Sequence, residues 1–116
     1  GKIINISSRG AIRAFHGGVT YSASKAGLQL MTQTMALEFG AHNIQANAIA
    51  PTVTNTPMGD SSWPPGKRRD AKLSRIPTGR FAESEEVANA VLFFASSQSD
   101  FVNGVEMSLD GGEGAT

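Results

Sequence analysis

The chain has 116 residues, with ten basic and ten acidic side chains and no cysteine. The length suits one small domain, and zero formal net charge argues against a nucleic acid or an anionic membrane as the main partner. The absence of cysteine excludes disulfides and thiolate metal sites and fits a reducing cytoplasm, and no apolar run approaches the ~20 residues that span a bilayer.

The chain opens on a predicted buried strand, residues 2–7, because its apolar run is short and β-branched. Ser8 ends this strand, and residues 9–20 form a loop punctuated by glycine. Ligands bind at the carboxyl ends of parallel strands, so we expect the chemistry here. Because the first residue is Gly1 and not methionine, we interpret the chain as part of a longer protein.

A long helix is predicted from about Val19 to Gly40, since apolar residues recur at three- and four-residue spacing and Gly40 can act as the C-cap. The helix carries Tyr21 and Lys25, which lie one turn apart on the same face. A free phenol has a pKa near 10 and is a poor proton donor at neutral pH. An ammonium about 4 Å away favours the phenolate by on the order of 4 kcal/mol at an effective dielectric near 20.

This pair could therefore act as an acid/base group, and the Ser8 hydroxyl could bind the substrate oxygen beside it. A tyrosine and a lysine four residues apart are by themselves more often part of a solvated helix face. The assignment to catalysis therefore depends on the rest of the chain.

Ile44–Ala50 is the second predicted strand, and Pro51 ends it. Residues 52–67 are predicted to form a long polar loop that carries the only tryptophan, Trp63, and loops of this length are usually functional or mobile. Residues 67–72 are expected to form a short solvated helix, because a run of charge is usually a surface.

Acidic residues at Glu83–Glu86 predict a helix N-terminus, and the helix is expected to run to about Ser96. Asn103–Gly104 indicates a turn, Val105–Leu109 the third strand, and residues 113–116 a flexible tail. The order strand, helix, strand, helix, strand, with right-handed crossovers, predicts a parallel α/β sheet. The two histidines, His16 and His42, have no partners at ligand spacing, so we predict no metal site.

Five ordered segments together resemble the carboxyl-terminal half of the short-chain dehydrogenase/reductase family. They are Ile4–Ser8, Tyr21–Ala26, Asn47–Pro51, Arg75–Phe81 and Asp110–Gly112. The resemblance implies a partial Rossmann-like doubly wound parallel sheet with three strands and two main helices, with the N-terminal half missing. Residues 1–112 would be the catalytic half of that domain and residues 113–116 a tail.

Within the family, residues 51–59 with Trp63, and residues 36–42, most resemble the dicarbonyl/L-xylulose reductase branch. The resemblance implies that Ser8 polarises the substrate carbonyl and that Tyr21 donates a proton to it. Lys25 would make the phenol more acidic and hold the nicotinamide ribose. The cofactor, NADP(H) or NAD(H), would contact these two residues and Val53, Thr54 and Thr56. The substrate, a small carbonyl or alcohol, would contact Ser8, Arg9 and His16 beneath a lid from Met58 to about Arg75.

No glycine-rich dinucleotide-binding turn follows a strand in this sequence; the nearest spacing, Gly112 to Gly114, lies in the tail. Our preferred hypothesis is therefore that the chain is part of a cytoplasmic NAD(P)H-dependent carbonyl or sugar reductase. On this hypothesis the chain is inactive without the other half of the protein. The alternative is a non-catalytic remnant that acts as an oligomerisation or regulatory module. The apolar helix faces predict a homo-oligomer, a dimer or a tetramer, under either hypothesis.

Overall fold

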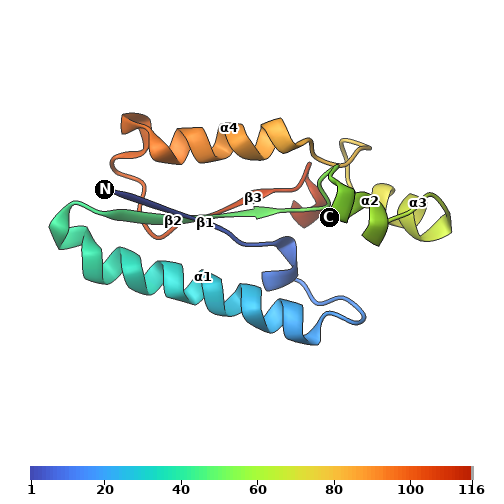
Figure 1. Ribbon diagram of the computed structural model, residues 1–116, viewed down its shortest axis with the longest axis horizontal. Coiled ribbons are helices and arrows are strands. Elements are labelled where there is room, and N and C mark those ends of the chain that lie inside the picture. Colours follow the sequence, from blue (N-terminus) through green and yellow to red (C-terminus); the bar gives the residue numbers. More distant parts are fainter. Residues whose placement is uncertain (116) are drawn as a thin grey trace.

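The computed structural model describes residues 1–115 as three layers, a parallel sheet with one long helix on each face (Figure 1). The strands lie in the order β1-β2-β3. The chain runs through β1 (Lys2–Ile6), α1 (Val19–Phe39), β2 (Gln45–Pro51), α2 (Pro57–Ser62), α3 (Lys67–Leu73), α4 (Ser84–Ala95) and β3 (Glu106–Leu109). The expected parallel α/β sheet with two main helices is confirmed.

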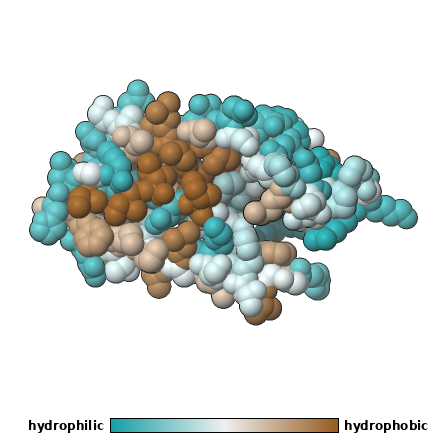
Figure 2. Space-filling view, viewed as in Figure 1, coloured by the Kyte–Doolittle hydropathy of each residue, from teal (hydrophilic) through white to brown (hydrophobic). Residues whose placement is uncertain are grey.

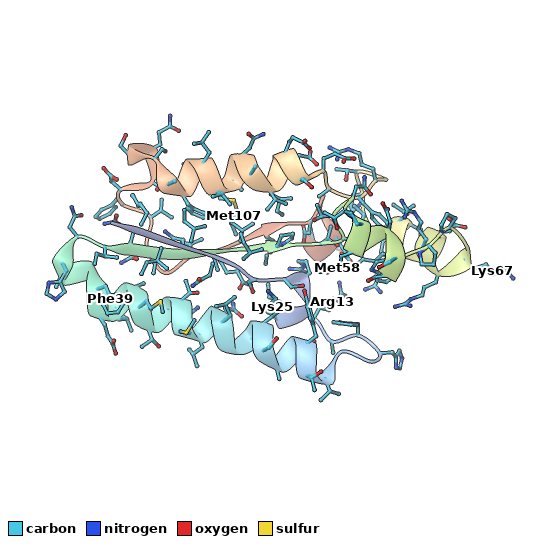
Figure 3. The ribbon with its side chains drawn as sticks, in the orientation of Figure 1. Arg13, Lys25, Phe39, Met58, Lys67 and Met107 are labelled. Carbon is cyan, nitrogen blue, oxygen red and sulfur yellow. The ribbon has the colours of Figure 1, made fainter. Side chains whose placement is uncertain are left out.

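The strand register decides which side chains face which helix. Asn5, Ala48 and Glu106 are paired across the three strands, and the Asn5 amide donates to the Thr32 hydroxyl of α1 at 2.9 Å. This row of residues therefore faces α1, because paired positions in a parallel sheet share a face. The next row faces α4, and Figure 3 shows Met107 pointing toward that helix.

The central strand β2 is the best-buried part of the chain. Its neighbours pair on both edges, and helices cover both faces, so Ala46, Ala48, Ile49 and Ala50 are fully buried. By contrast, β1 has one free edge: it is half-buried along most of its length, and Ile6 is 42% exposed. The prediction of a buried first strand is therefore wrong, because no strand of the described residues pairs with its other edge.

Two further expectations about local structure need correction, the loop at residues 52–67 and the flexible tail. The predicted loop 52–67 contains the helix α2, which Thr56 caps and Pro57 begins. The predicted C-cap of α1 at Gly40 is confirmed; Gly40 keeps a helical conformation, a 3-10 turn follows, and Asn43 takes the left-handed conformation with φ 56°. The tail is ordered through Ala115, with Glu113 only 3% exposed; Thr116 lies outside the described residues.

The remaining boundaries agree with the sequence pattern to within one or two residues, including the short charged helix α3 and the turn at Gly104, which has φ 75°. In the part of the chain that the structure describes, no helix is both long enough and apolar enough to cross a membrane.

Candidate active site

Ser8 follows β1 at the carboxyl edge of the sheet and begins a 3-10 turn. Its backbone is extended, with φ −164° and ψ 153°, and its Oγ accepts a hydrogen bond from the Gly10 amide at 3.0 Å. A serine hydroxyl can accept and donate at the same time. The cap occupies an acceptor position, so the Ser8 proton can still be donated to a ligand.

Gly10 allows the phenol of Tyr21 to lie against this turn. A Cβ atom at Gly10 would stand 3.1 Å from Tyr21 Cε1 and 3.0 Å from Phe15 Cε1, closer than ordinary carbon contacts. The rings of Tyr21 and Phe15 meet edge to face, with centroids 6.1 Å apart, an arrangement that aromatic rings favour. The phenol is thus packed on one side, while Tyr21 remains 46% exposed.

Lys25 lies one helical turn after Tyr21 and reaches the end of β1. Its Nζ donates to the Ile6 carbonyl oxygen at 2.8 Å and lies 5.9 Å from the centroid of the Tyr21 ring. Figure 3 shows Lys25 pointing from α1 toward the sheet. The structure thus places Tyr21 and Lys25 on one face of α1, beside the turn that Ser8 begins.

The carboxylate of Glu106 lies near Ser7 and Arg9, on the sheet face that α1 covers, and it was not among the predicted site residues. Both its oxygens are buried, and neither has a hydrogen-bond partner in good geometry among the described residues. Burial raises its pKa, which the nearby Ser7 hydroxyl and Arg9 guanidinium lower by a smaller amount. An acidic residue inside a predicted strand was the available signal.

The Arg9 side chain extends from the turn after Ser8 to the end of β3. Its Nε forms an ion pair with Asp110 Oδ2 at 3.1 Å, and its Nη1 donates to Ser108 Oγ at 3.1 Å. These contacts tie the turn after Ser8 to the end of β3. His16, the other predicted substrate contact, is exposed and makes no hydrogen bond or ion pair with any described residue.

The predicted cofactor loop follows β2 and is held by backbone pairing with Ala82. The Val53 carbonyl accepts from the Ala82 amide at 3.0 Å, and Thr54 pairs with the same residue. Thr56 Oγ1 accepts from the Gly59 amide at 3.0 Å and so caps α2. A Cβ at Gly59 would stand 2.1 Å from the Thr54 carbonyl oxygen, so this close approach of α2 requires glycine.

The donors at this edge fit the nicotinamide end of a dinucleotide cofactor. An ammonium carries three N–H groups, and the Lys25 ammonium uses one of them on Ile6, so two remain for ribose hydroxyls. The Tyr21 and Ser8 hydroxyls can both donate to a carbonyl oxygen. All these groups lie at the carboxyl ends of β1 and β2 or face them, where α/β sheets bind ligands.

Comparisons with known proteins identify reductases that are similar to this chain. A family model described as enoyl-(acyl carrier protein) reductase matches residues 1–113. L-xylulose reductase of Mus musculus is 42% identical over 116 residues, which cover all of this chain and 48% of that protein. A 3-oxoacyl-[acyl-carrier-protein] reductase of Thermotoga maritima is 46% identical over 112 residues, 97% of this chain and 45% of that protein.

A solved structure of gluconate 5-dehydrogenase from Burkholderia cenocepacia, in complex with NADP and tartrate, has a TM-score of 0.94 and 33% identity. It is matched over all of this chain and 46% of its own. The chain thus spans about half the length of the relatives that it matches.

Proposed function

The chain belongs to the short-chain dehydrogenase/reductase family of oxidoreductases, and from this membership we propose that it carries the catalytic residues of an NAD(P)H-dependent carbonyl reductase. The observation that supports this most is the position of the Lys25 ammonium, bonded to the Ile6 carbonyl beside the Tyr21 ring. Residues 1–112 would form the catalytic half of a Rossmann-type domain in the complete protein.

In the proposed reaction the nicotinamide, when bound, supplies the hydride that reduces the carbonyl carbon. The Ser8 hydroxyl donates a hydrogen bond to the substrate oxygen and orients the carbonyl. Tyr21 Oη gives its proton to that oxygen as negative charge develops there. The Lys25 ammonium stabilises the resulting phenolate through its positive charge and binds the ribose with its remaining N–H groups. Oxidation of the alcohol would use the same groups in reverse.

We propose a ketose or a dicarbonyl as the substrate, and a place in carbohydrate metabolism. The support is the name of the L-xylulose reductase relative and the sugar-acid dehydrogenase among the similar structures. Both NADP(H) and NAD(H) remain proposed cofactors, with Val53, Thr54 and Thr56 bordering the nicotinamide. His16 and Arg9 remain proposed substrate contacts, although the contacts of Arg9 with Asp110 and Ser108 favour a supporting role.

We also propose that the complete protein is a cytoplasmic homo-oligomer, a dimer or a tetramer. Leu30 and Leu37 on the outer face of α1 are 65% and 86% exposed, and exposed apolar side chains on one helix favour association. The same observation favours the second candidate function, a non-catalytic module that only associates.

Activity measurements separate the two candidates. The complete protein should reduce diacetyl or L-xylulose with NADPH, and Tyr21→Phe should lower turnover by about 10²–10⁴-fold, the usual contribution of a general acid, while NADPH still quenches protein fluorescence on binding. Ser8→Ala should also lose turnover, whereas Ser97→Ala, an exposed serine in the turn after α4, should not. Full turnover in Tyr21→Phe would remove the proposed mechanism.

A further inference from the structure

The carboxylate of Glu113 joins three segments that are distant in the sequence. Glu113 is 3% exposed, and it accepts hydrogen bonds from Lys72 Nζ at 2.6 and 2.8 Å and from Thr52 Oγ1 at 2.7 Å. Lys72 belongs to α3 and Thr52 directly follows β2, while Glu113 itself begins the 3-10 turn after β3. One buried carboxylate therefore connects α3 to the ends of two strands.

The backbone around Glu113 is fixed by Asp110, whose carboxylate accepts from the amides of Gly112 and Gly114 at 3.1 and 3.0 Å. The turn also contacts the segment that follows α3. A Cβ at Gly111 would stand 2.3 Å from Thr78 Oγ1, and one at Gly112 would stand 3.1 Å from Pro77 Cγ. The Glu113 side chain is thus presented to α3 from a rigid support.

On the other side, Lys72 is part of a cluster of cations and aromatic rings. Its Nζ lies 5.9 Å from the centroid of the Trp63 ring, and the Arg68 guanidinium lies 4.5 Å from the same ring. Arg69 donates to the Trp63 carbonyl at 2.8 Å and stacks on Phe81 at 4.7 Å. The residues expected to form only a solvated helix therefore hold Trp63, and Lys72 links this cluster to Glu113.

We propose that Glu113 is a positioning residue that latches the segment α2–α3 to the nicotinamide-bordering loop. Through Lys72 it fixes α3 beyond the carboxyl ends of the strands (Figure 1), and through Thr52 it fixes the start of residues 53–56. The lid and the cofactor loop are thus held in one relative position. The inference rests on the proposed function in treating residues 58–75 as a substrate lid and residues 53–56 as the loop that borders the nicotinamide.

The charge on Glu113 supports this role. Burial raises its pKa, but the hydrogen bonds from Lys72 and Thr52 and the charges of Lys72 and Arg75 lower it by more, so the net direction is downward. A carboxyl whose pKa is lower in the fold stabilises the fold above its ordinary pKa, and that stabilisation is lost as the pH falls through the lowered value. Glu113 is therefore ionised at neutral pH, where it forms its ion pair with Lys72.

Hydrogen exchange in the complete protein, without cofactor or substrate, tests the latch whether or not the protein turns over. Glu113→Gln and Lys72→Met should each speed exchange of the α3 amides by about tenfold or more, with α4 as the internal reference. Lys67→Met, at the exposed start of α3, is the matched control and should not speed it. Unchanged exchange in Glu113→Gln would overturn the proposal, and so would an equal increase in α4.

Two further readouts separate positioning from general stability. The emission of Trp63, taken as the difference from Trp63→Phe, should shift in Glu113→Gln but not in Lys67→Met. Thr52→Val keeps the Lys72 ion pair, so it should leave exchange in α3 unchanged while weakening NADPH binding by about fivefold, the value of one hydrogen bond. If Glu113→Gln speeds exchange in α3 but leaves NADPH binding unaltered, the proposed coupling between α3 and the loop at residues 53–56 is contradicted. Absent turnover with the exchange results as expected would count against the proposed function alone.

Discussion

The Lys25 side chain is fixed at its Cα by the helix α1 and at its ammonium by a hydrogen bond to β1. Its ammonium is therefore ordered without a ligand. Its stem leaves α1, and its Nζ is bonded to the Ile6 carbonyl at 2.8 Å. A free lysine side chain loses up to about 2 kcal/mol of rotamer entropy when it is ordered. Here the fold has already ordered it, so the ammonium is in place beside the phenol before any ligand binds.

Glu106 leads to a prediction about pH. Its pKa is raised by burial against the smaller effects of Ser7 and Arg9, so the folded protein holds this proton at a pH where the unfolded chain releases it. Stability therefore falls as the pH rises through that interval. Glu106→Gln should raise the melting temperature of the complete protein at pH 7 by a few degrees, equivalent to about 1 kcal/mol, and the gain should vanish in acid.

The control for this experiment is Glu85→Gln, an exposed acid in the first turn of α4, for which a change within about 0.5 kcal/mol is expected. A lower melting temperature for Glu106→Gln at pH 7 would mean that the attraction between Glu106 and Arg9 outweighs the cost of burial.

The candidate site could be predicted only where the chemistry depends on local spacing. Tyr21 and Lys25 share a face because they are four residues apart on a helix. The bond from Lys25 to Ile6 and the ion pair of Arg9 with Asp110 join residues 19 and 101 positions apart, and no local pattern specifies such contacts. For this reason the contacts of Glu106 and Glu113 could not be predicted from local spacing.

At the scale of elements, the strands and the two long helices follow from hydrophobic periodicity, and the structure confirms them to within a residue or two. The helix α2 was missed although its signal was present, since Thr56 is an N-cap and Pro57 sits at the first helical position. The pair Pro64–Pro65 favoured a loop for the whole segment. The residues after Asp110 are structured because they make tertiary contacts with α3. Secondary-structure propensities carry no information on such contacts.

Asn47 fixes the connection from α4 to β3 and leads to a prediction about these elements. It is 1% exposed, its amide donates to the Val102 carbonyl at 2.8 Å, and its Oδ1 accepts from the Val105 amide at 3.0 Å. Removing the side chain leaves both backbone groups without this partner. Asn47→Ala should destabilise the complete protein by about 2 kcal/mol or more, measured by chemical denaturation.

Asn89→Ala, an exposed position on α4, serves as the control and should change the free energy of unfolding by less than about 0.5 kcal/mol. Equal effects of the two substitutions would show that the bonds of Asn47 to the turn do not support β3.

At the scale of the whole molecule, the chain exposes more surface than its size requires. A compact protein of 12.1 kDa exposes roughly 6,000 Å², whereas this chain exposes 6965 Å². Its radius of gyration is 15.0 Å, against roughly 13 Å for a compact chain of this length. Figure 2 shows apolar side chains gathered on the face that carries the free edge of β1 and α4. Exposed apolar residues of these two elements include Ile6 in β1, at 42%, and Leu92 in α4, at 68%.

This exposed face predicts that the 116-residue chain is only marginally stable as an isolated monomer. Among the described residues, the free edge of β1 leaves backbone donors and acceptors without sheet partners, and five of the nine buried apolar side chains are alanines. The isolated chain should therefore melt broadly, with an enthalpy well below the ~80 kcal/mol expected for a cooperative domain of this length, and should bind an apolar dye below its transition.

The complete protein, in which we expect another segment to cover this face, should melt sharply and bind little dye. A sharp transition of the isolated chain, with sedimentation showing a monomer and no dye binding, would mean that the face in Figure 2 needs no partner.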